Sequence, residues 1–321
     1  MIVLFIRRCI LVLITLFMLT LISYAILLKD PLNSIFTVPH FYSGYFDYIN
    51  NLLHGDLGIS YQGGEELTGV ILAVLPPTLE LCFTSMCFAV LFGIPLGFLG
   101  SLSQKSWLEK SVHGISLFGL SIPIFWLAPI LLYFSAIHGW EISAIGQYNL
   151  LYEINVVTGF PLIDVWFVNE PYRLKVIQNV LQHLALPTLV LSILPTMEVA
   201  RFIQQRTSFL LTQNYIQIAL SRGGSRFYIL RKYLLRNTLP QLVPQSARLF
   251  TLVITQCMLI EGTFGWPGIG RWLIEAVRLQ DYNAISAGVI AIGLCILLAN
   301  ILAQLFAFLL DPLNKKGWYV K

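Results

Sequence analysis

The sequence predicts an all-α polytopic membrane protein with six transmembrane helices. Two observations on composition support this fold class: 57% of the 321 residues are apolar and only 11% are charged, whereas soluble domains have about 45–50% apolar and about 25% charged residues. The length would allow two soluble domains, but so few charges could not cover two globular surfaces. A third observation is a series of long segments that carry no charge at all.

Five segments without Asp, Glu, Lys or Arg are long enough to cross a bilayer core, which needs about 20 helical residues. In chain order these predicted spans are residues 9–28, 81–104, 111–140, 176–197 and 282–310. The first of them could also be a secretory signal, because two arginines precede it. Its 20 residues exceed the apolar stretch of about 7–15 residues in such signals, so we expect an uncleaved anchor.

A sixth span is less regular, because the apolar run 249–260 has only 12 residues between Arg248 and Glu261. Extension back to Gln241 makes it long enough, with the Arg248 guanidinium directed toward the interface or the interior of the bundle. The alternative is a half-span. Five full spans would place the two termini on opposite sides of the membrane.

The charges between the spans predict the orientation, since cytoplasmic segments are enriched in Lys and Arg. With the N-terminus inside, the inner segments hold 14 basic and 2 acidic residues, and the outer segments hold 5 basic and 11 acidic residues. Both termini are therefore predicted to be cytoplasmic. The basic character belongs to one membrane face, and we expect no nucleic-acid partner.

Missing motifs argue against catalysis and cofactors in this chain. No Gly-x-x-x-x-Gly-Lys-Ser/Thr phosphate loop occurs, and neither His-Glu-x-x-His nor Cys-x-x-Cys is present, so nucleotide hydrolysis and metal binding are not expected. The five cysteines all fall within predicted spans and do not describe a disulfide framework. We expect no catalytic residue, no metal and no cofactor.

The inner loop 201–240 is long for a connector. Its first part, 209–220, mixes apolar and polar residues, two glycines follow, and Ser225 can cap a second helix. Phe227, Leu230 and Leu234 are predicted to share one face of that helix, with basic residues on the rest. Two short amphipathic helices of this kind form a docking surface, or they lie on anionic lipid headgroups.

Ordered motifs along the chain resemble the permease subunits of ABC importers, in their dipeptide/oligopeptide branch. The strongest are 215–223 with 235–240 in the inner loop, 77–81 (Pro-Thr-Leu-Glu-Leu) and 264–270 (Phe-Gly-Trp-Pro-Gly-Ile-Gly). Others are 29–31, 121–126, 281–282 and 311–313. Residues 150–153, 158–164 and 318–319 are most similar to permeases of antimicrobial-peptide transport systems. One departure is Gln217-Ile218-Ala219, where broader importer families have Glu-Ala-Ala.

This resemblance implies the type I ABC importer permease fold and a domain organisation. Residues 1–73 would hold an anchor helix and the first periplasmic segment. Residues 74–305 would form the transmembrane domain, with a periplasmic segment at 139–175 and the cytoplasmic coupling loop at 201–240, and 306–321 would be the end of the last helix and a cytoplasmic tail. The residues implied to couple to the ATPase are Tyr215, Gln217, Ala219, Arg222, Gly223, Arg226, Arg231, Arg236, Asn237 and Pro240.

A few charged residues fall within or beside the predicted spans, where charge is costly. Glu198 and Arg201 lie three apart on one helix face and are predicted to pair. Glu80 is expected on the outer side, where it caps the bundle. Glu261 either faces the translocation path or caps its helix against the following turn, and a gate or turn is predicted at Trp266, Pro267, Gly268 and Gly270.

The resemblance implies a non-enzymatic permease subunit in the bacterial inner membrane that moves peptides, cationic antimicrobial peptides among them. Its implied partners are a second permease, two ATP-binding subunits, a periplasmic substrate-binding protein and membrane lipid. One alternative is a permease that exports putrescine. An alternative of a different class is a stand-alone secondary carrier, although the inverted repeats common in such carriers are not evident here.

Overall fold

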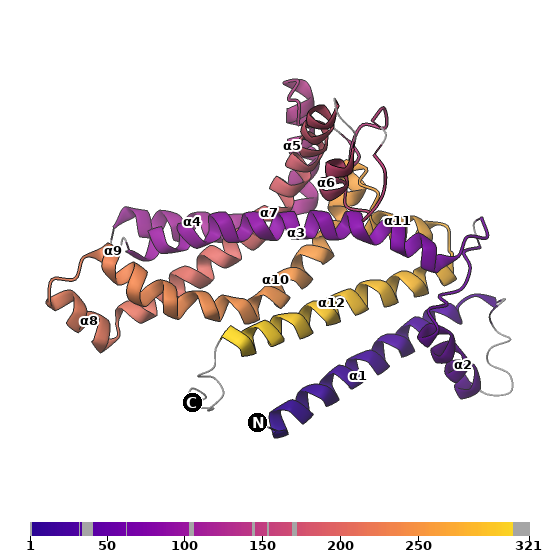
Figure 1. The fold of residues 1–321 in the computed structure, drawn as a ribbon, viewed down its shortest axis with the longest axis horizontal. Helices are drawn as coiled ribbons and strands as arrows, with labels where there is room; N and C mark the ends of the chain where they lie inside the picture. Colours follow the sequence, from indigo (N-terminus) through magenta and orange to yellow (C-terminus); the bar gives the residue numbers. More distant parts are fainter. Residues whose placement is uncertain are drawn as a thin grey trace. The chain divides into compact units, whose positions relative to one another are not determined.

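The computed structural model describes residues 2–31, 33, 41–61, 63–102, 106–142, 145–152, 154–168 and 172–310 (Figure 1). Some charged residues and motifs used in the sequence analysis lie outside these residues. They are Lys105, Glu153, Glu170 and the tail 311–321. The described residues are mostly helical and contain no β-strand, only an isolated bridge between Ile59 and Glu66. The all-α prediction is confirmed.

Within the described residues, seven α-helices are 14 residues or longer and pass through the apolar segments. They are α1 (Ile2–Leu27), α3 (Leu67–Leu102), α4 (Trp107–Ser121), α5 (Ile124–Ile137), α7 (Arg173–Leu211), α10 (Leu235–Phe264) and α12 (Tyr282–Leu310). The shorter elements are α2 (Phe41–Leu53), α6 (Pro161–Asp164), the 3₁₀ turn η2 (Val165–Phe167), α8 (Asn214–Ser221), α9 (Arg226–Ile229), the π-helical turn η3 (Leu230–Leu234) and α11 (Ile269–Arg278).

Five helical segments of the described chain are long and apolar enough to cross a membrane. One of them runs for 39 residues, Arg226–Phe264, through α9, η3 and α10. The irregular predicted span is therefore a full-length helix, and the half-span alternative is wrong.

The predicted span 111–140 is not one straight helix. It is divided into α4 and α5, which are bent by 96° at the break. The break falls at Pro123: a proline disfavours the helical region at the residue before it, and Ile122 is extended at φ −75°, ψ 122°. The count of six spans holds when this bent pair is counted as one.

The chain divides into two compact units, and the first comprises Met1–Glu80, Ile145–Val180 and Phe264–Leu298. Its core joins α3, α11 and α12 through Leu67, Ile71, Ile269 and Ala287. A polar contact links α1 to α12 in the same unit, because the Ser23 and Ser286 hydroxyls lie 2.7 Å apart.

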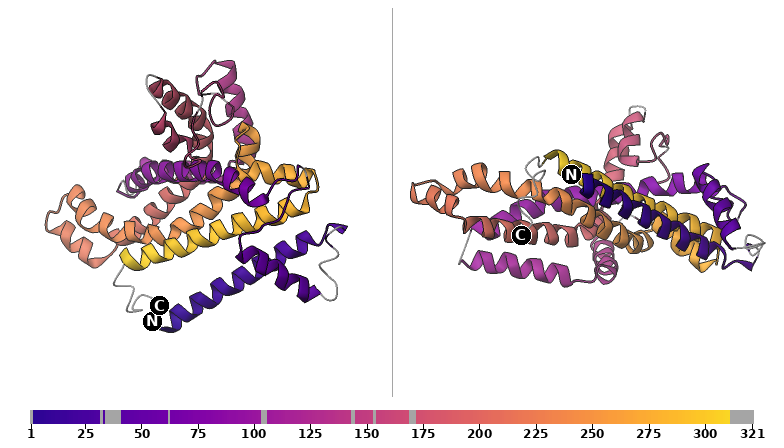
Figure 2. Two further views of the ribbon diagram at one scale, coloured as in Figure 1. Left: turned by 45° about the vertical axis from the view of Figure 1, so that its right-hand side comes forward. Right: turned by 90° about the horizontal axis from the view of Figure 1, so that it is seen from below.

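The second unit comprises Leu81–Ala144, Leu181–Thr263 and Ala299–Lys321. Its core is formed by α3, α7, α8 and the turn that follows α9, with Phe98, Val199, Ile203 and Leu234 buried together. Figure 2 shows, from two further sides, that the segment carrying α8 joins the ends of α7 and α10.

Glycines let α3 approach α7 closely within the second unit. A Cβ built on Gly97 would lie 2.6 Å from the carbonyl oxygen of Ala200 and 2.7 Å from the Cβ of Ile203. Because one of these atoms belongs to the backbone, an added methyl group requires the helices to separate. Close helix packing at small residues is the usual means of association in a membrane.

We expect Gly97→Ala to lower the free energy of unfolding by about 1–3 kcal/mol, the usual cost of overpacking. The matched control is Gly114→Ala in α4, where a Cβ meets nothing within 4 Å and alanine favours the helix. Thermal unfolding of the two purified variants in detergent measures the stability of each. Equal transition temperatures for the two variants would contradict this packing.

Candidate functional site

The predicted coupling loop is shorter than residues 201–240. Helix α7 continues to Leu211, so Arg201 and Arg206 are helical, and the last part of the predicted loop belongs to η3 and α10. Only residues 212–225, which contain α8, connect the long helices. The prediction of two short helices is therefore wrong for the second, which continues without a break into α10.

Ser225 begins this second helix as predicted, because its Oγ accepts a hydrogen bond from the Tyr228 backbone N–H at 3.2 Å. Just before it, Gly223 has φ +83°, a conformation that glycine adopts without steric cost. These two residues turn the chain from α8 into α9.

Helix α8 is fixed to the second unit by its apolar side and by a side-chain contact. Ile216 is fully buried, and the Gln217 Nε2 donates to the carbonyl oxygen of Leu211 at 2.6 Å. The Tyr215 ring lies 6.1 Å from the ring of Tyr233, and burial raises the pKa of the Tyr215 phenol above its ordinary value. Because α8 is held on one side, its other side is presented in a defined orientation.

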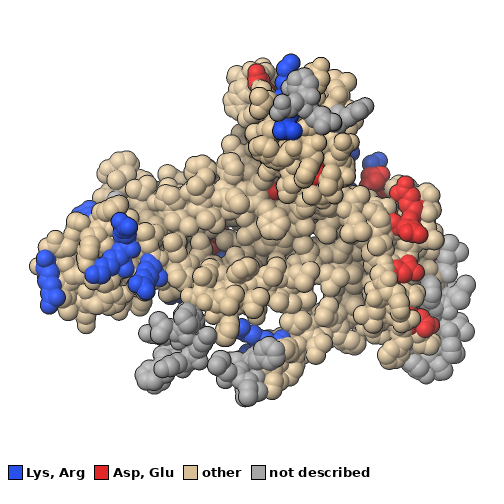
Figure 3. Space-filling model, viewed as in Figure 1, with Lys and Arg blue, Asp and Glu red and all other residues tan. Residues whose placement is uncertain are grey.

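The exposed side of this segment combines apolar and basic residues, and we call it the α8–α9 surface. Ile218, Phe227 and Tyr228 are exposed large side chains. Figure 3 shows lysine and arginine side chains gathered at the end that carries α8 and α9. The exposed basic and polar residues of this surface are Arg222, Arg226, Arg231, Lys232, Arg236 and Asn237.

The apolar face predicted for the second helix needs correction. Phe227 is exposed, whereas Ile229 and Leu234 are fully buried. Their spacing of five residues matches the π-helical turn at Leu230–Leu234, since a π-helix bonds residues i and i+5. A regular 3.6-residue period could not predict this register.

Sequence reasoning also missed the surroundings of Lys232. Its Nζ lies 5.0 Å from the ring centroid of Tyr228 and 5.7 Å from that of Tyr233, and it donates to the Tyr228 hydroxyl at 2.6 Å. The spacing of Tyr228 and Lys232, four residues apart, is the signal in the sequence that could have indicated this contact.

The glycine-rich turn 264–270 belongs to the first unit and meets the Pro77–Thr78 motif of α3. The fully buried Trp266 donates from Nε1 to the Pro77 carbonyl oxygen at 2.9 Å. The Ile269 backbone N–H donates to the Thr78 Oγ1 at 2.8 Å. Two motifs almost 190 residues apart in the sequence therefore form one contact.

The predicted turn residues occupy the first turn of α11 and its approach. Pro267 follows Trp266, Gly268 is the N-cap of α11 with φ −97°, and Gly270 is buried within the helix. Gly265, which precedes them, has φ +62° and allows the sharp change of direction. The structure thus shows a turn at these positions.

Glu80 anchors the segment 145–168 to α3 in the first unit. It is 4% exposed, and its carboxylate accepts hydrogen bonds from the Gln147 Nε2 at 2.9 Å and from the Leu162 backbone N–H at 2.7 Å. Sequence reasoning assigned Glu80 a capping role and gave Gln147 none. Both residues act together as the connection between α3 and this segment.

Glu261 lies in the interior of the second unit. It is fully buried in α10, and the Cys257 Sγ donates to its Oε1 at 3.3 Å. The carboxyl group therefore accepts a hydrogen bond from a residue one turn earlier in the same helix.

The predicted partner of Glu198 is wrong. Its Oε2 lies 2.9 Å from the Nη2 of Arg248, so the ion pair joins α7 to α10 and does not involve Arg201. A charged side chain in a span pairs with another charge when it can, and Arg248 was the one basic residue inside a predicted span. Spacing along one helix could not reveal this contact between two helices.

These features define a class: a polytopic helical membrane protein whose long helices are connected by a short, firmly packed helix with a basic exposed side. The family described as binding-protein-dependent transport system inner membrane component matches residues 89–316. The chain belongs to this family and is a multi-pass inner-membrane protein.

Individual relatives cover the whole chain. A Haemophilus influenzae protein named peptide transport system permease protein SapB is 57% identical over 98% of both chains. An Escherichia coli K12 protein named putrescine export system permease protein SapB is 38% identical over 99% of both, and the dipeptide transport system permease protein DppB of the same strain is 30% identical over 84% of this chain and 79% of its own. The chain is an ABC transporter permease, and it is similar to proteins named SapB along its full length.

A solved structure supports the fold independently. A chain of the MetNI methionine ABC transporter, described in inward-facing conformations, superposes with a TM-score of 0.55. It is 19% identical, and the match covers 76% of this chain and 97% of that one. At this identity the likeness concerns the fold, and it confirms the predicted type I importer permease fold.

We expect Glu80→Ala to lower the free energy of unfolding by about 1–3 kcal/mol, because the buried Gln147 amide and Leu162 N–H lose their acceptor. It should also speed proteolysis within 145–168. Thermal unfolding and limited proteolysis in detergent measure these effects.

The control for Glu80 is Glu275→Ala, which removes a half-exposed carboxylate 3.9 Å from Arg278. Surface pairs of this kind contribute about 0–1 kcal/mol. If both variants behaved alike in unfolding and in proteolysis, the anchoring role of Glu80 would be refuted.

Proposed function

We propose that this chain is the permease subunit of an ATP-driven transporter for peptides and that the α8–α9 surface receives the ATP-binding subunits. The observation that supports this most strongly is the firm attachment of α8: Ile216 is buried beneath it and Gln217 is bonded to the end of α7. A force applied to the exposed side would therefore be transmitted to α7 and α10.

The proposal places both termini and the α8–α9 surface in the cytoplasm. Charge supports this orientation, because basic residues are enriched on the cytoplasmic side of membrane proteins and this surface exposes Arg222, Arg226, Arg231 and Arg236. The bent pair α4 and α5 is counted as one broken span. The alternative role, contact with anionic headgroups, would use the same charges and would bury the exposed Ile218 and Phe227 at the membrane interface.

The transporter in this proposal contains a second permease, two ATP-binding subunits and a periplasmic substrate-binding protein. ATP hydrolysis takes place on the ATP-binding subunits, and this chain supplies neither a catalytic residue nor a cofactor. Closure of the ATP-binding subunits drives a rigid-body change between inward-open and outward-open states. The binding protein docks on the periplasmic side of the membrane, where the charge-based topology puts the segment anchored by Glu80.

Peptides are the proposed substrates, because the Haemophilus relative, which shares 57% identity, is named a peptide transport permease. Putrescine is the second candidate, since the Escherichia coli K12 relative is named a putrescine export permease at 38% identity. Cationic substrates of either class suit the acidic outer segments, which would attract them electrostatically.

Reversal of two charges tests the role of the α8–α9 surface. In the complex reconstituted in liposomes, we expect Arg222→Glu with Arg226→Glu to reduce peptide uptake and substrate-dependent ATP hydrolysis at least tenfold. The reason is that an electrostatically matched docking surface is replaced by a repulsive one. Assembly is checked by copurification of the subunits after crosslinking.

The matched control is Lys110→Glu, which reverses an exposed charge of α4 that is not among the residues defining this surface. It should retain uptake and ATP hydrolysis. Unchanged coupling in the double variant, or an equal loss in the control, would refute the proposed docking surface. Uptake by the chain alone under an ion gradient would favour a secondary carrier.

A further inference from the structure

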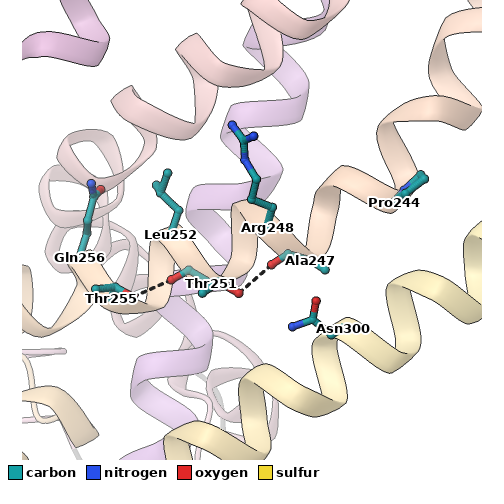
Figure 4. A pocket seen from close by; sticks show the side chains of 8 residues that line it. All are labelled: Pro244, Ala247, Arg248, Thr251, Leu252, Thr255, Gln256 and Asn300. Carbon is teal, nitrogen blue, oxygen red and sulfur yellow. Dashed lines mark hydrogen bonds between the residues drawn. The ribbon is translucent and has the colours of Figure 1, made fainter. Parts of the chain in front are cut away.

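A groove runs along the exposed side of α10 in the second unit, with a volume of about 580 Å³ (Figure 4). Most of its lining belongs to one face of α10, and Asn300 of α12 completes it. The polar residues are Arg248, Thr251, Thr255, Gln256 and Asn300, and the apolar ones are Pro244, Ala247 and Leu252.

The groove lies at the middle of a membrane span. Its α10 residues run from Pro244 to Gln256 within Leu235–Phe264. The Arg248 side chain is 65% exposed there, and a charged side chain within a span almost always faces the interior of the bundle or a water-filled cavity. This face of α10 therefore borders a water-filled path or another protein surface.

The ion pair gives the groove an ordered charge. Glu198 is only 22% exposed, and it holds Arg248 by a single contact between Oε2 and Nη2 at 2.9 Å. A guanidinium carries five N–H donors in a planar fork, so the others remain for a ligand while Glu198 fixes the orientation. The complementary group for such a fork is a carboxylate.

The rest of the lining suits amide donors. Thr251 and Thr255 donate their hydroxyl protons to the carbonyls of Ala247 and Thr251, at 3.0 and 2.7 Å, so their oxygen lone pairs stay available as acceptors (Figure 4). Within the part of the chain that the structure describes, the Gln256 Oε1 is buried without a hydrogen-bond partner. A ligand that lies on this face needs N–H groups.

The spacing sets the length of the ligand. Arg248 and Gln256 are separated by eight residues of helix, a rise of about 12 Å. An extended peptide covers about 3.3–3.6 Å per residue, so about three or four residues span this interval. A short peptide with a free C-terminus meets all three requirements.

We propose that the α10 groove is a peptide contact site in the transport path: Arg248, positioned by Glu198, binds the C-terminal carboxylate, and Thr255 and Gln256 accept backbone N–H groups. This inference rests on the proposed function and narrows its substrate class. Putrescine, a diamine, has no carboxylate to fill the free donors of Arg248.

Transport of matched peptides tests the site. The complete complex in liposomes is given trialanine, trialanine with a C-terminal amide, and putrescine, each radiolabelled. We expect the wild type to take up the free acid about tenfold better than the amide, as for loss of one charge-assisted hydrogen bond. In Arg248→Gln that ratio should fall about tenfold relative to the wild type. The binding protein is the same in both measurements, so its own preference cancels between them.

Arg206→Gln on α7 is the control, since it removes an exposed arginine outside the groove and should keep the tenfold ratio. Gln256→Leu should raise the KM of both peptides about equally. This second variant and the wild-type ratio test the site even where Arg248→Gln fails to fold.

Three outcomes would overturn the site. They are a wild type that does not distinguish acid from amide, an unchanged ratio in Arg248→Gln, and loss of the second permease from Arg248→Gln complexes, which would make the groove a subunit interface. Uptake of putrescine alone would refute peptides as the substrate class, and absence of ATP-dependent uptake of all three compounds would refute the proposed function itself.

Discussion

The low polarity of the bilayer is the constraint on which this structure depends, because every charge within a span has to be paired, buried with a partner or turned toward water. Three carboxyl groups show how the chain meets it. Glu198 pairs with Arg248, Glu80 accepts two hydrogen bonds from the segment 145–168, and Glu261 is bound by Cys257. The contacts of Glu198 and Glu80 join elements that are distant in the sequence. The contact of Glu261 fixes a carboxyl group in the interior.

Structural features that follow from composition or from the preferred conformation of one residue were predicted correctly. Uncharged length located the membrane segments, and the Ser225 cap and the Gly223 turn followed from the conformations that serine and glycine favour. The span 111–140 was predicted as one helix, and the 96° bend between α4 and α5 at Pro123 was not foreseen. A proline indicates where a helix is interrupted, whereas the angle depends on the packing of the two parts.

Contacts between distant segments could not be predicted from one sequence. Spacing suggested Arg201 as the partner of Glu198, because residues three apart share a helix face, but Arg248 from another helix lies closer. The resemblance to importer permeases supplied both the Pro77–Thr78 motif and the turn 264–270 without relating them. The structure shows that Trp266 and Ile269 bind directly to Pro77 and Thr78.

The central claim is that the exposed side of α8 receives the ATP-binding subunits. A photoreactive amino acid in place of Ile218, irradiated in native membranes, tests it most directly because Ile218 is exposed while its neighbour Ile216 is buried. We expect a covalent adduct between this chain and an ATP-binding subunit, and none from the same amino acid at the exposed Trp107 of α4. Adducts with lipid alone at position 218 would contradict it.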